Sequence, residues 1–197
     1  MRAQEQTVLN LIGGLDKCFV IPPFQRNYEW TFEQCDELFE DIVVAYKTGK
    51  SHYLGNVVYY VGKNSGAAYS EYILVDGQQR VTTILLLLCA IRSLVSDDIK
   101  KSINQRYLKN DTSSDKFRIR LKQTSYDTDS FIAVVDDMDL TQYSKSNVVK
   151  NYLHFIELLK ESSVSPEDIY NTIPKLEIVD VNLQINDDLT AVQTVFE

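Results

Sequence analysis

Cysteine, histidine and long apolar runs are scarce in this sequence of 197 residues, and each scarcity excludes a class of protein. The three cysteines, Cys18, Cys35 and Cys89, are odd in number and widely spaced. This pattern disfavours a disulfide scaffold or a cysteine-based zinc site and fits a reducing cytoplasm. The two histidines, His52 and His154, lie far apart without the neighbours that a metal site needs. We therefore predict a cytoplasmic protein without a metal site of its own.

Sequence signals for membranes and for common catalytic sites are also missing. The strongest apolar run, 85–91, is too short to span a bilayer and is followed by Arg92. The polar start of the chain does not have the pattern of a secretory signal peptide. Neither G-x-x-x-x-G-K-[S/T] nor G-x-G-x-x-G occurs, and no Ser/His/Asp arrangement or H-N-H nuclease core is recognisable. We expect no association with membranes and no nuclease centre in this chain.

The composition is that of an ordered globular protein of one domain, or one domain with an appendage. Apolar residues make up 44% and charged residues 24%, and 12 tyrosines and 8 phenylalanines supply core material. The net charge of −8 disfavours a broad nucleic-acid-binding surface. A local basic cleft is still compatible with this charge.

The most informative stretch is 72–83, which reads YILVDGQQRVTT. Its apolar start predicts a strand, and the nearly continuous apolar run 81–95 predicts a helix packed on most sides. Gly77 allows a sharp turn between them. Asp76 and Gln79 have the spacing of a capping box at the start of the helix.

The polar residues of this turn favour two interpretations. A helix N-terminus attracts phosphate, Arg80 suits a bidentate phosphate contact, and Gln78 and Gln79 add neutral donors and acceptors. Alternatively, Asp76 and Gln79 only cap the helix, and Arg80 pairs with a surface carboxylate. Because capping does not need two glutamines and an arginine, the residues of this turn favour the first interpretation, a phosphate site.

A second polar stretch follows a predicted strand at 18–21 and the pair Pro22-Pro23, which ends that strand. It contains Gln25, Arg26 and Tyr28. If the two strands are neighbours that end at the same edge of a sheet, both polar stretches converge. Tyr28 is then either an ordinary core aromatic or a residue that stacks on a base, while Gln25 and Arg26 meet phosphate or ribose.

The remaining pattern predicts a mixed α+β domain. The strands expected at 53–61 and 71–75 form an antiparallel hairpin. Alternation at 116–123 predicts a half-exposed strand whose basic face consists of Arg118, Arg120 and Lys122. A final strand is expected at 176–185, and helices are expected at 6–12, 32–46, within 97–110, at 129–137, 148–160, from 166 and from 188. Because the chain ends inside the last expected helix, we expect a truncated protein.

Three segments together resemble the N-terminal domain of GmrSD-type restriction proteins: IPPFQRNYEW at 21–30, Tyr53-Leu54-Gly55, and LVDGQQRVTT at 74–83. The resemblance is strong over about 15–95 and looser afterwards. That family is distantly related to the ParB and sulfiredoxin superfold. It implies an α+β fold in which a small mixed sheet packs on a central buried helix, with an additional mainly helical region. We expect a nucleotide-binding core at 1–96 and a mainly helical extension with two strands at 97–197, within one domain.

The resemblance also implies a function. Family members use the D-G-Q-Q-R element to bind and hydrolyse nucleoside triphosphates, so Asp76, Gln78, Gln79 and Arg80 are expected to be catalytic. Gln25 and Arg26 are implied as companions around the phosphates, with Gly77 in the turn. Full-length members often carry a C-terminal H-N-H nuclease domain and attack modified foreign DNA. This chain has no such domain, so its DNA partner belongs to the full-length protein or a partner subunit.

We therefore favour a regulatory domain that binds and hydrolyses a nucleoside triphosphate with Mg²⁺. In this hypothesis Gln78, Gln79 or Gln25 orients a water, and Asp76 either caps the helix or helps to hold Mg²⁺ through water. The alternative is a DNA-binding module without enzymatic activity, in which the same cleft and the basic face contact the DNA backbone. A third interpretation is a scaffold with an ordinary helix cap.

Overall fold

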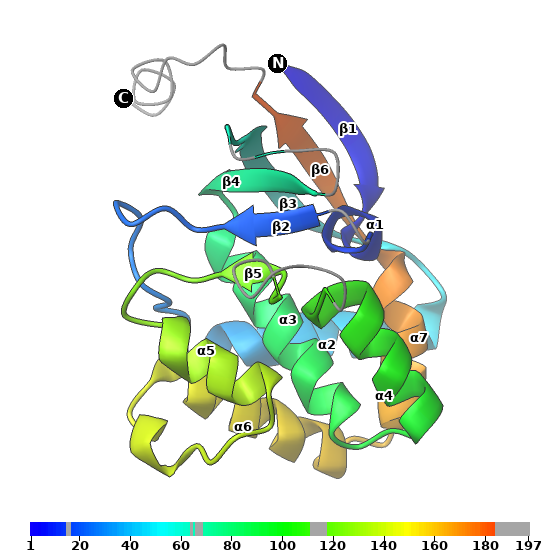
Figure 1. The fold of residues 1–197 in the computed structure, drawn as a ribbon. Helices are drawn as coiled ribbons and strands as arrows, with labels where there is room; N and C mark the ends of the chain where they lie inside the picture. Colours follow the sequence, from blue (N-terminus) through cyan, green and yellow to red (C-terminus); the bar gives the residue numbers. More distant parts are fainter. Residues whose placement is uncertain (15–16, 64, 66–68, 111–117, 184–197) are drawn as a thin grey trace.

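One mixed sheet lies on one side of a layer of helices (Figure 1). The computed structural model describes residues 1–14, 17–63, 65, 69–110 and 118–183. Among these, the sheet has the order β1-β6-β3-β4-β2-β5. The strands are β1 (Arg2–Thr7), β2 (Lys17–Val20), β3 (His52–Val61), β4 (Ser70–Asp76), β5 (Leu121–Lys122) and β6 (Leu176–Asn182).

The strand β4 lies between two partners of opposite direction. It pairs antiparallel with β3, as the predicted hairpin requires, and parallel with β2, in the register Val20↔Ile73. The strand β6, from the C-terminal half of the described chain, pairs parallel with β3 and antiparallel with β1. The sheet therefore contains strands from both halves of the chain.

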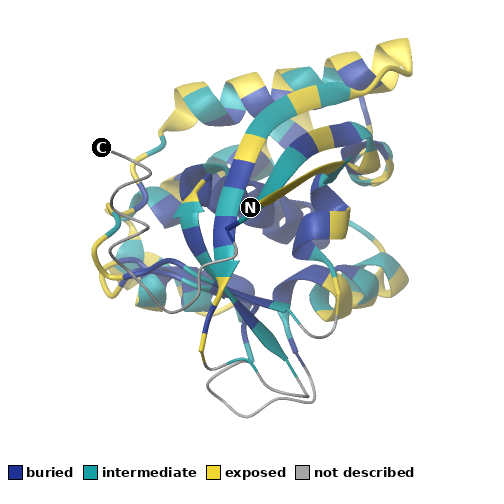
Figure 2. Cartoon of the chain, turned by 90° about the horizontal axis from the view of Figure 1, so that it is seen from above, coloured by how far each residue is buried: buried dark blue, intermediate teal, exposed yellow. Residues whose placement is uncertain are grey.

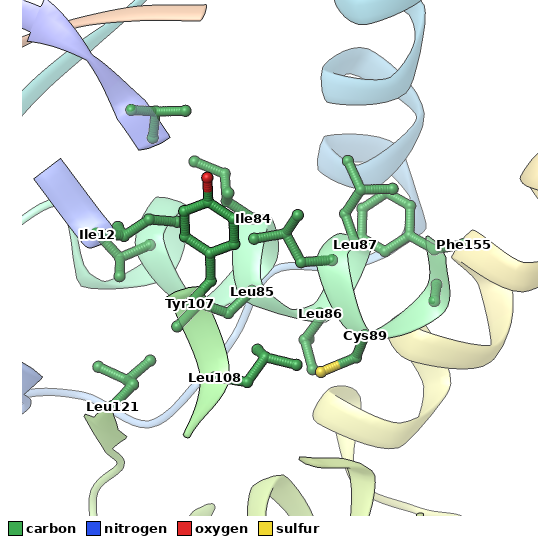
Figure 3. Packing of buried hydrophobic residues seen from close by; sticks show 14 of the residues in the cluster. Ile12, Ile84, Leu85, Leu86, Leu87, Cys89, Tyr107, Leu108, Leu121 and Phe155 are labelled. Carbon is green, nitrogen blue, oxygen red and sulfur yellow. The ribbon is translucent and has the colours of Figure 1, made fainter. Parts of the chain in front are cut away.

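The helical layer surrounds α3 (Gln78–Arg92). Apart from Arg80, every residue of α3 is buried. Figure 3 shows Leu85, Leu86, Leu87 and Cys89 packing against side chains from several other elements, including Phe155. Truncating a buried leucine of this kind to alanine typically costs about 2–5 kcal/mol. The long apolar run thus explains why α3 is the centre of the fold.

The other helices, apart from the short turn at 141–143, each contribute buried residues to the core, and those at the outside of the molecule show buried and exposed residues in alternation (Figure 2). They are α1 (Val8–Ile12), α2 (Phe32–Thr48), α4 (Asp97–Ile103), the π-helical turn η1 (Asn104–Leu108), α5 (Thr128–Val135), η3 (Thr141–Tyr143), α6 (Asn147–Glu161), α7 (Pro166–Thr172) and η4 (Ile173–Lys175). Within the described residues, none of the helices is long and apolar enough to cross a membrane.

The predicted α+β class, with a mixed sheet packed on a central buried helix, is confirmed. The relation to ParB and sulfiredoxin stays a prediction. The helix expected at 6–12 is wrong in its first part, because residues 2–7 form the polar edge strand β1, whose pairing with β6 is not visible in its sequence pattern. The helix expected from 188 and the first residues of the strand expected at 116–123 lie outside the described residues.

Candidate functional site

The two polar stretches meet at one edge of the sheet. Since β2 and β4 are parallel neighbours, the segments that follow them leave the sheet on the same side. Together they line a pocket of about 220 Å³, which we call the joint pocket. The predicted convergence is confirmed. The pocket is lined by Gln25, Arg26, Trp30, Val75, Asp76, Gly77, Gln78, Gln79 and Arg80.

Gly77 forms the corner between β4 and α3. Its φ of 86° lies in the left-handed region, and a Cβ there would stand only 3.0 Å from the Asn56 carbonyl oxygen. The first helical bond runs from the Val81 N–H to the Gly77 oxygen at 3.0 Å. The amides before Val81 therefore have no carbonyl partner within the helix, and no side chain caps this terminus. They stand at the joint pocket, where the helix dipole favours an anion.

The predicted capping box at this helix is wrong. Gly77, not Asp76, is the N-cap residue, and Asp76 is exposed at the rim of the joint pocket. The side chain of Gln79 points elsewhere. Its Oε1 accepts hydrogen bonds from the backbone N–H groups of Glu29 at 2.9 Å and Trp30 at 3.4 Å. Its Nε2 donates to the Asn27 oxygen at 2.8 Å, so Gln79 ties α3 to the loop after β2.

Gln78 has a different environment. Its side chain is 6% exposed, and its Nε2 donates to the Arg26 carbonyl oxygen at 3.2 Å. Because that partner is an acceptor, the amide nitrogen must face it, and this sets the orientation of the oxygen. Oε1 has no hydrogen-bond partner among the described residues. A buried unpaired acceptor is costly, and Gln78, the residue that carries it, lines the joint pocket.

Arg80 is the half-buried cation of the joint pocket. Its Nη1 donates to the Asn56 oxygen at 2.9 Å, and its guanidinium lies against Gly55. A Cβ on Gly55 would approach Nη2 to 3.0 Å, and the φ of 102° there also requires glycine. Burial lowers the pKa of Arg80, whereas Asp76 and Tyr53 raise it. The guanidinium stays charged because arginine does not deprotonate in proteins.

Gln25 and Arg26 complete the loop side of the joint pocket. The Gln25 Nε2 donates to the Val75 oxygen at 2.9 Å, which links the loop to the end of β4. Arg26 pairs with Glu29 at 3.2 Å, but both side chains are more than half exposed, at 63% and 56%. An ion pair this exposed contributes little, so Arg26 can turn to an anion in the pocket.

The expectation that Tyr28 stacks on a base is wrong, because Tyr28 is a core residue. It is 4% exposed, and its N–H donates to Asp127 Oδ2 at 2.7 Å. Its hydroxyl lies 2.6 Å from Thr83 Oγ1 and accepts from Asn151 Nδ2 at 2.9 Å. The alternative of an ordinary core aromatic is the one that holds. Asp127, which anchors this loop from the start of α5, carried no motif that could have identified it.

The basic face predicted at 118–122 is not an open surface. Arg120 is 1% exposed and donates to the backbone oxygens of Gln105 at 2.7 Å and Lys109 at 3.2 Å. Arg118 makes two hydrogen bonds of 2.8 Å to Asp136. Arg118, whose side chain is 40% exposed, and Lys122 are partly accessible, whereas Arg120 is not. The expected DNA contact through Arg120 is therefore wrong.

The fold and the joint pocket define an α+β domain with a polar, cation-lined site at a helix N-terminus. The family model described as "GmrSD restriction endonuclease, N-terminal domain" matches residues 8–197. The chain belongs to this family, which indicates a restriction or antiphage defence protein. A search of the curated proteins found no match.

Proposed function

We propose that the joint pocket binds the phosphates of a nucleoside triphosphate and supports their hydrolysis. The observation that carries this proposal is the uncapped N-terminus of α3, which opens on a pocket also lined by Gln78, whose buried Oε1 has no partner among the described residues. Helix N-termini favour phosphate through free N–H groups and the helix dipole. Arg80 and Arg26 supply the positive charge that a polyphosphate requires.

The residues have distinct roles in this proposal. The amides at the start of α3 and the Arg80 guanidinium hold phosphate oxygens. Once its buried Oε1 turns toward the pocket, Gln78 accepts a hydrogen bond from the attacking water and so orients the water oxygen toward phosphorus. The bond from the water oxygen to the terminal phosphorus forms as the bond to the leaving nucleoside diphosphate breaks, and the proton of the water is released to solvent. Gln79, which is occupied by the loop, positions Trp30 and Glu29 and does not contact the nucleotide.

The residues around the joint pocket offer a magnesium ion one carboxylate, that of Asp76, and no complete protein ligand set among the described residues. Among the described residues, no group of three or more His, Cys, Asp or Glu side chains could hold a metal ion. Asp76 is an exposed carboxylate at the rim, and Mg²⁺ is commonly held by one or two carboxylates together with substrate phosphates and waters. When bound, the ion neutralises charge on the phosphates.

In the full-length protein, we expect the nucleotide state of this domain to control cleavage of DNA. The catalytic centre for that step is expected in a C-terminal H-N-H nuclease region or in a partner subunit. DNA binding by this domain itself is the weaker alternative, because Arg118 and Arg120 are engaged within the protein.

Thermal denaturation with ATP, GTP, CTP or UTP and Mg²⁺ tests the phosphate site. A ligand at about 100 times its dissociation constant stabilises the protein by about 2.7 kcal/mol. For a chain of this size that corresponds to a melting shift of roughly 5–11 °C. Arg80→Ala should abolish the shift, while Arg2→Ala, which removes the same charge from the edge strand β1, should retain it. An unchanged shift in Arg80→Ala would refute the proposal.

A further inference from the structure

A second pocket adjoins the joint pocket. It has a volume of about 240 Å³, lies between α2 and β3, and shares Arg80 and Trp30 with the joint pocket. We call it the side pocket. Each pocket alone is smaller than the roughly 300–1,000 Å³ typical of small-molecule sites, whereas the two together fall within that range. A single ligand that occupies both would pass Arg80 and Trp30.

The two pockets differ in charge. Cations outnumber carboxylates in the joint pocket, which holds Arg26 and Arg80 beside the N-terminus of α3 and has Asp76 at its rim. In the side pocket, the carboxylates Glu37 and Asp41 outnumber the shared Arg80. Asp41 is paired with His52 at 3.0 Å. Glu37 has no hydrogen-bond or ion-pair partner among the described residues. Carboxylates repel phosphate and accept hydrogen bonds from hydroxyl, amino and imino groups, which are the donors of a nucleoside.

Trp30 gives the shared boundary an aromatic surface. Its backbone is fixed on both sides, because its N–H donates to Gln79 Oε1 at 3.4 Å and its oxygen accepts from Asn151 Nδ2 at 2.9 Å. Trp30 packs partly against the core and is a lining residue of both pockets. A base that stacks on such a ring gains affinity with little dependence on its identity.

From this geometry we infer that the side pocket binds the nucleoside half of the nucleotide, with the base against Trp30 and Glu37 accepting from the ribose hydroxyls or a base N–H group. The inference rests on the proposed function, because it assumes that the phosphates occupy the joint pocket. It assigns a whole nucleotide as the preferred ligand, bound more tightly than a bare polyphosphate. Glu37 therefore determines specificity without touching the reacting phosphate.

Comparing nucleoside triphosphates with inorganic tripolyphosphate, both with Mg²⁺, separates the two pockets. Trp30 is the sole tryptophan of the sequence, so its fluorescence, excited beyond the absorption of the bases, reports directly on the shared boundary. We expect a triphosphate nucleotide to bind at least tenfold more tightly than tripolyphosphate and to change the emission of Trp30 more strongly. A 2′-deoxynucleotide that binds more weakly assigns Glu37 to the ribose; equal binding assigns it to the base.

The variant Glu37→Gln keeps the size of the side chain and removes its charge. We expect it to weaken nucleotide binding about tenfold and to leave tripolyphosphate binding unchanged or slightly stronger. Glu40→Gln is the matched control, because Glu40 lies on the same helix and does not line the side pocket. Equal affinity for nucleotide and tripolyphosphate, with no effect of Glu37→Gln, would overturn the inference and leave the phosphate site intact. Failure of both ligands to bind would overturn the proposed function as well.

Discussion

Replacing Gln79 by alanine should destabilise the protein far more than the same change at its neighbour Gln78. Gln79→Ala removes two hydrogen bonds of 2.9 and 2.8 Å and a longer one of 3.4 Å. It also leaves the Glu29 N–H and the Asn27 carbonyl without these partners. Each lost hydrogen bond costs about 0.5–1.5 kcal/mol. A buried group left without a partner costs up to about 3 kcal/mol, and at this site hydrogen bonds to water recover part of that cost. We expect a total loss of about 2–4 kcal/mol.

Gln78→Ala loses only one hydrogen bond, of 3.2 Å, and removes the unpaired Oε1. Its expected cost is therefore about 1 kcal/mol or less. The assay is urea denaturation of both variants followed by circular dichroism, with equal m-values as the check that the unfolding transition is comparable. In melting temperature, Gln79→Ala should lose roughly 4–16 °C. Equal losses, or a larger loss for Gln78→Ala, would refute the division of roles between the two glutamines.

Three further predictions follow from the structure. Tyr28→Phe should lower the free energy of unfolding by about 1–3 kcal/mol, because it removes two buried hydrogen bonds of the hydroxyl at about 0.5–1.5 kcal/mol each, and nucleotide affinity measured by titration calorimetry should not change. Gly55→Ala should abolish nucleotide binding in the same titration by displacing the Arg80 guanidinium, with circular dichroism as the check on folding. Hydrogen bonding from Arg118 lowers the pKa of Asp136 to about 2, below the usual value near 4. The stability contributed by Asp136 is therefore present above pH 4 and lost as pH falls through about 2, and Asp136→Asn should flatten that part of the stability curve in acid titration; an unchanged slope would contradict the assignment.

The central elements were predictable from the sequence because local pattern and tertiary role agree there. An apolar strand, a glycine corner and a long apolar helix at 72–95 fold as their composition indicates, and β4 and α3 form the middle of the protein. Chain order alone could not establish that β2 and β4 are neighbours. The convergence of Gln25 and Arg26 with Arg80 depended on that pairing, which the structure provides.

The failures have one physical cause, which is tertiary context overriding local pattern. The pattern around Tyr28 left both a core aromatic and a base-stacking residue open, and Arg120 looks like a surface group in the sequence, but both residues are buried and hydrogen-bonded to distant segments. Asp76 and Gln79 have the spacing of a cap, yet the φ of Gly77 shifts the start of the helix and gives Gln79 to the loop. The polar edge strand β1 is specified by β6, a partner nearly the whole chain away.

The most direct test of the account is a titration of the ¹⁵N-labelled protein with tripolyphosphate and Mg²⁺, followed by NMR of the backbone amides. The account predicts that the largest shifts occur at Gly77, Gln78, Gln79 and Arg80, with an accompanying shift of the Gln78 side-chain amide. Shifts confined to the lysines at 100–109, or no shifts even at tripolyphosphate concentrations far above those at which the nucleotide stabilises the protein, would contradict a phosphate site at the N-terminus of α3.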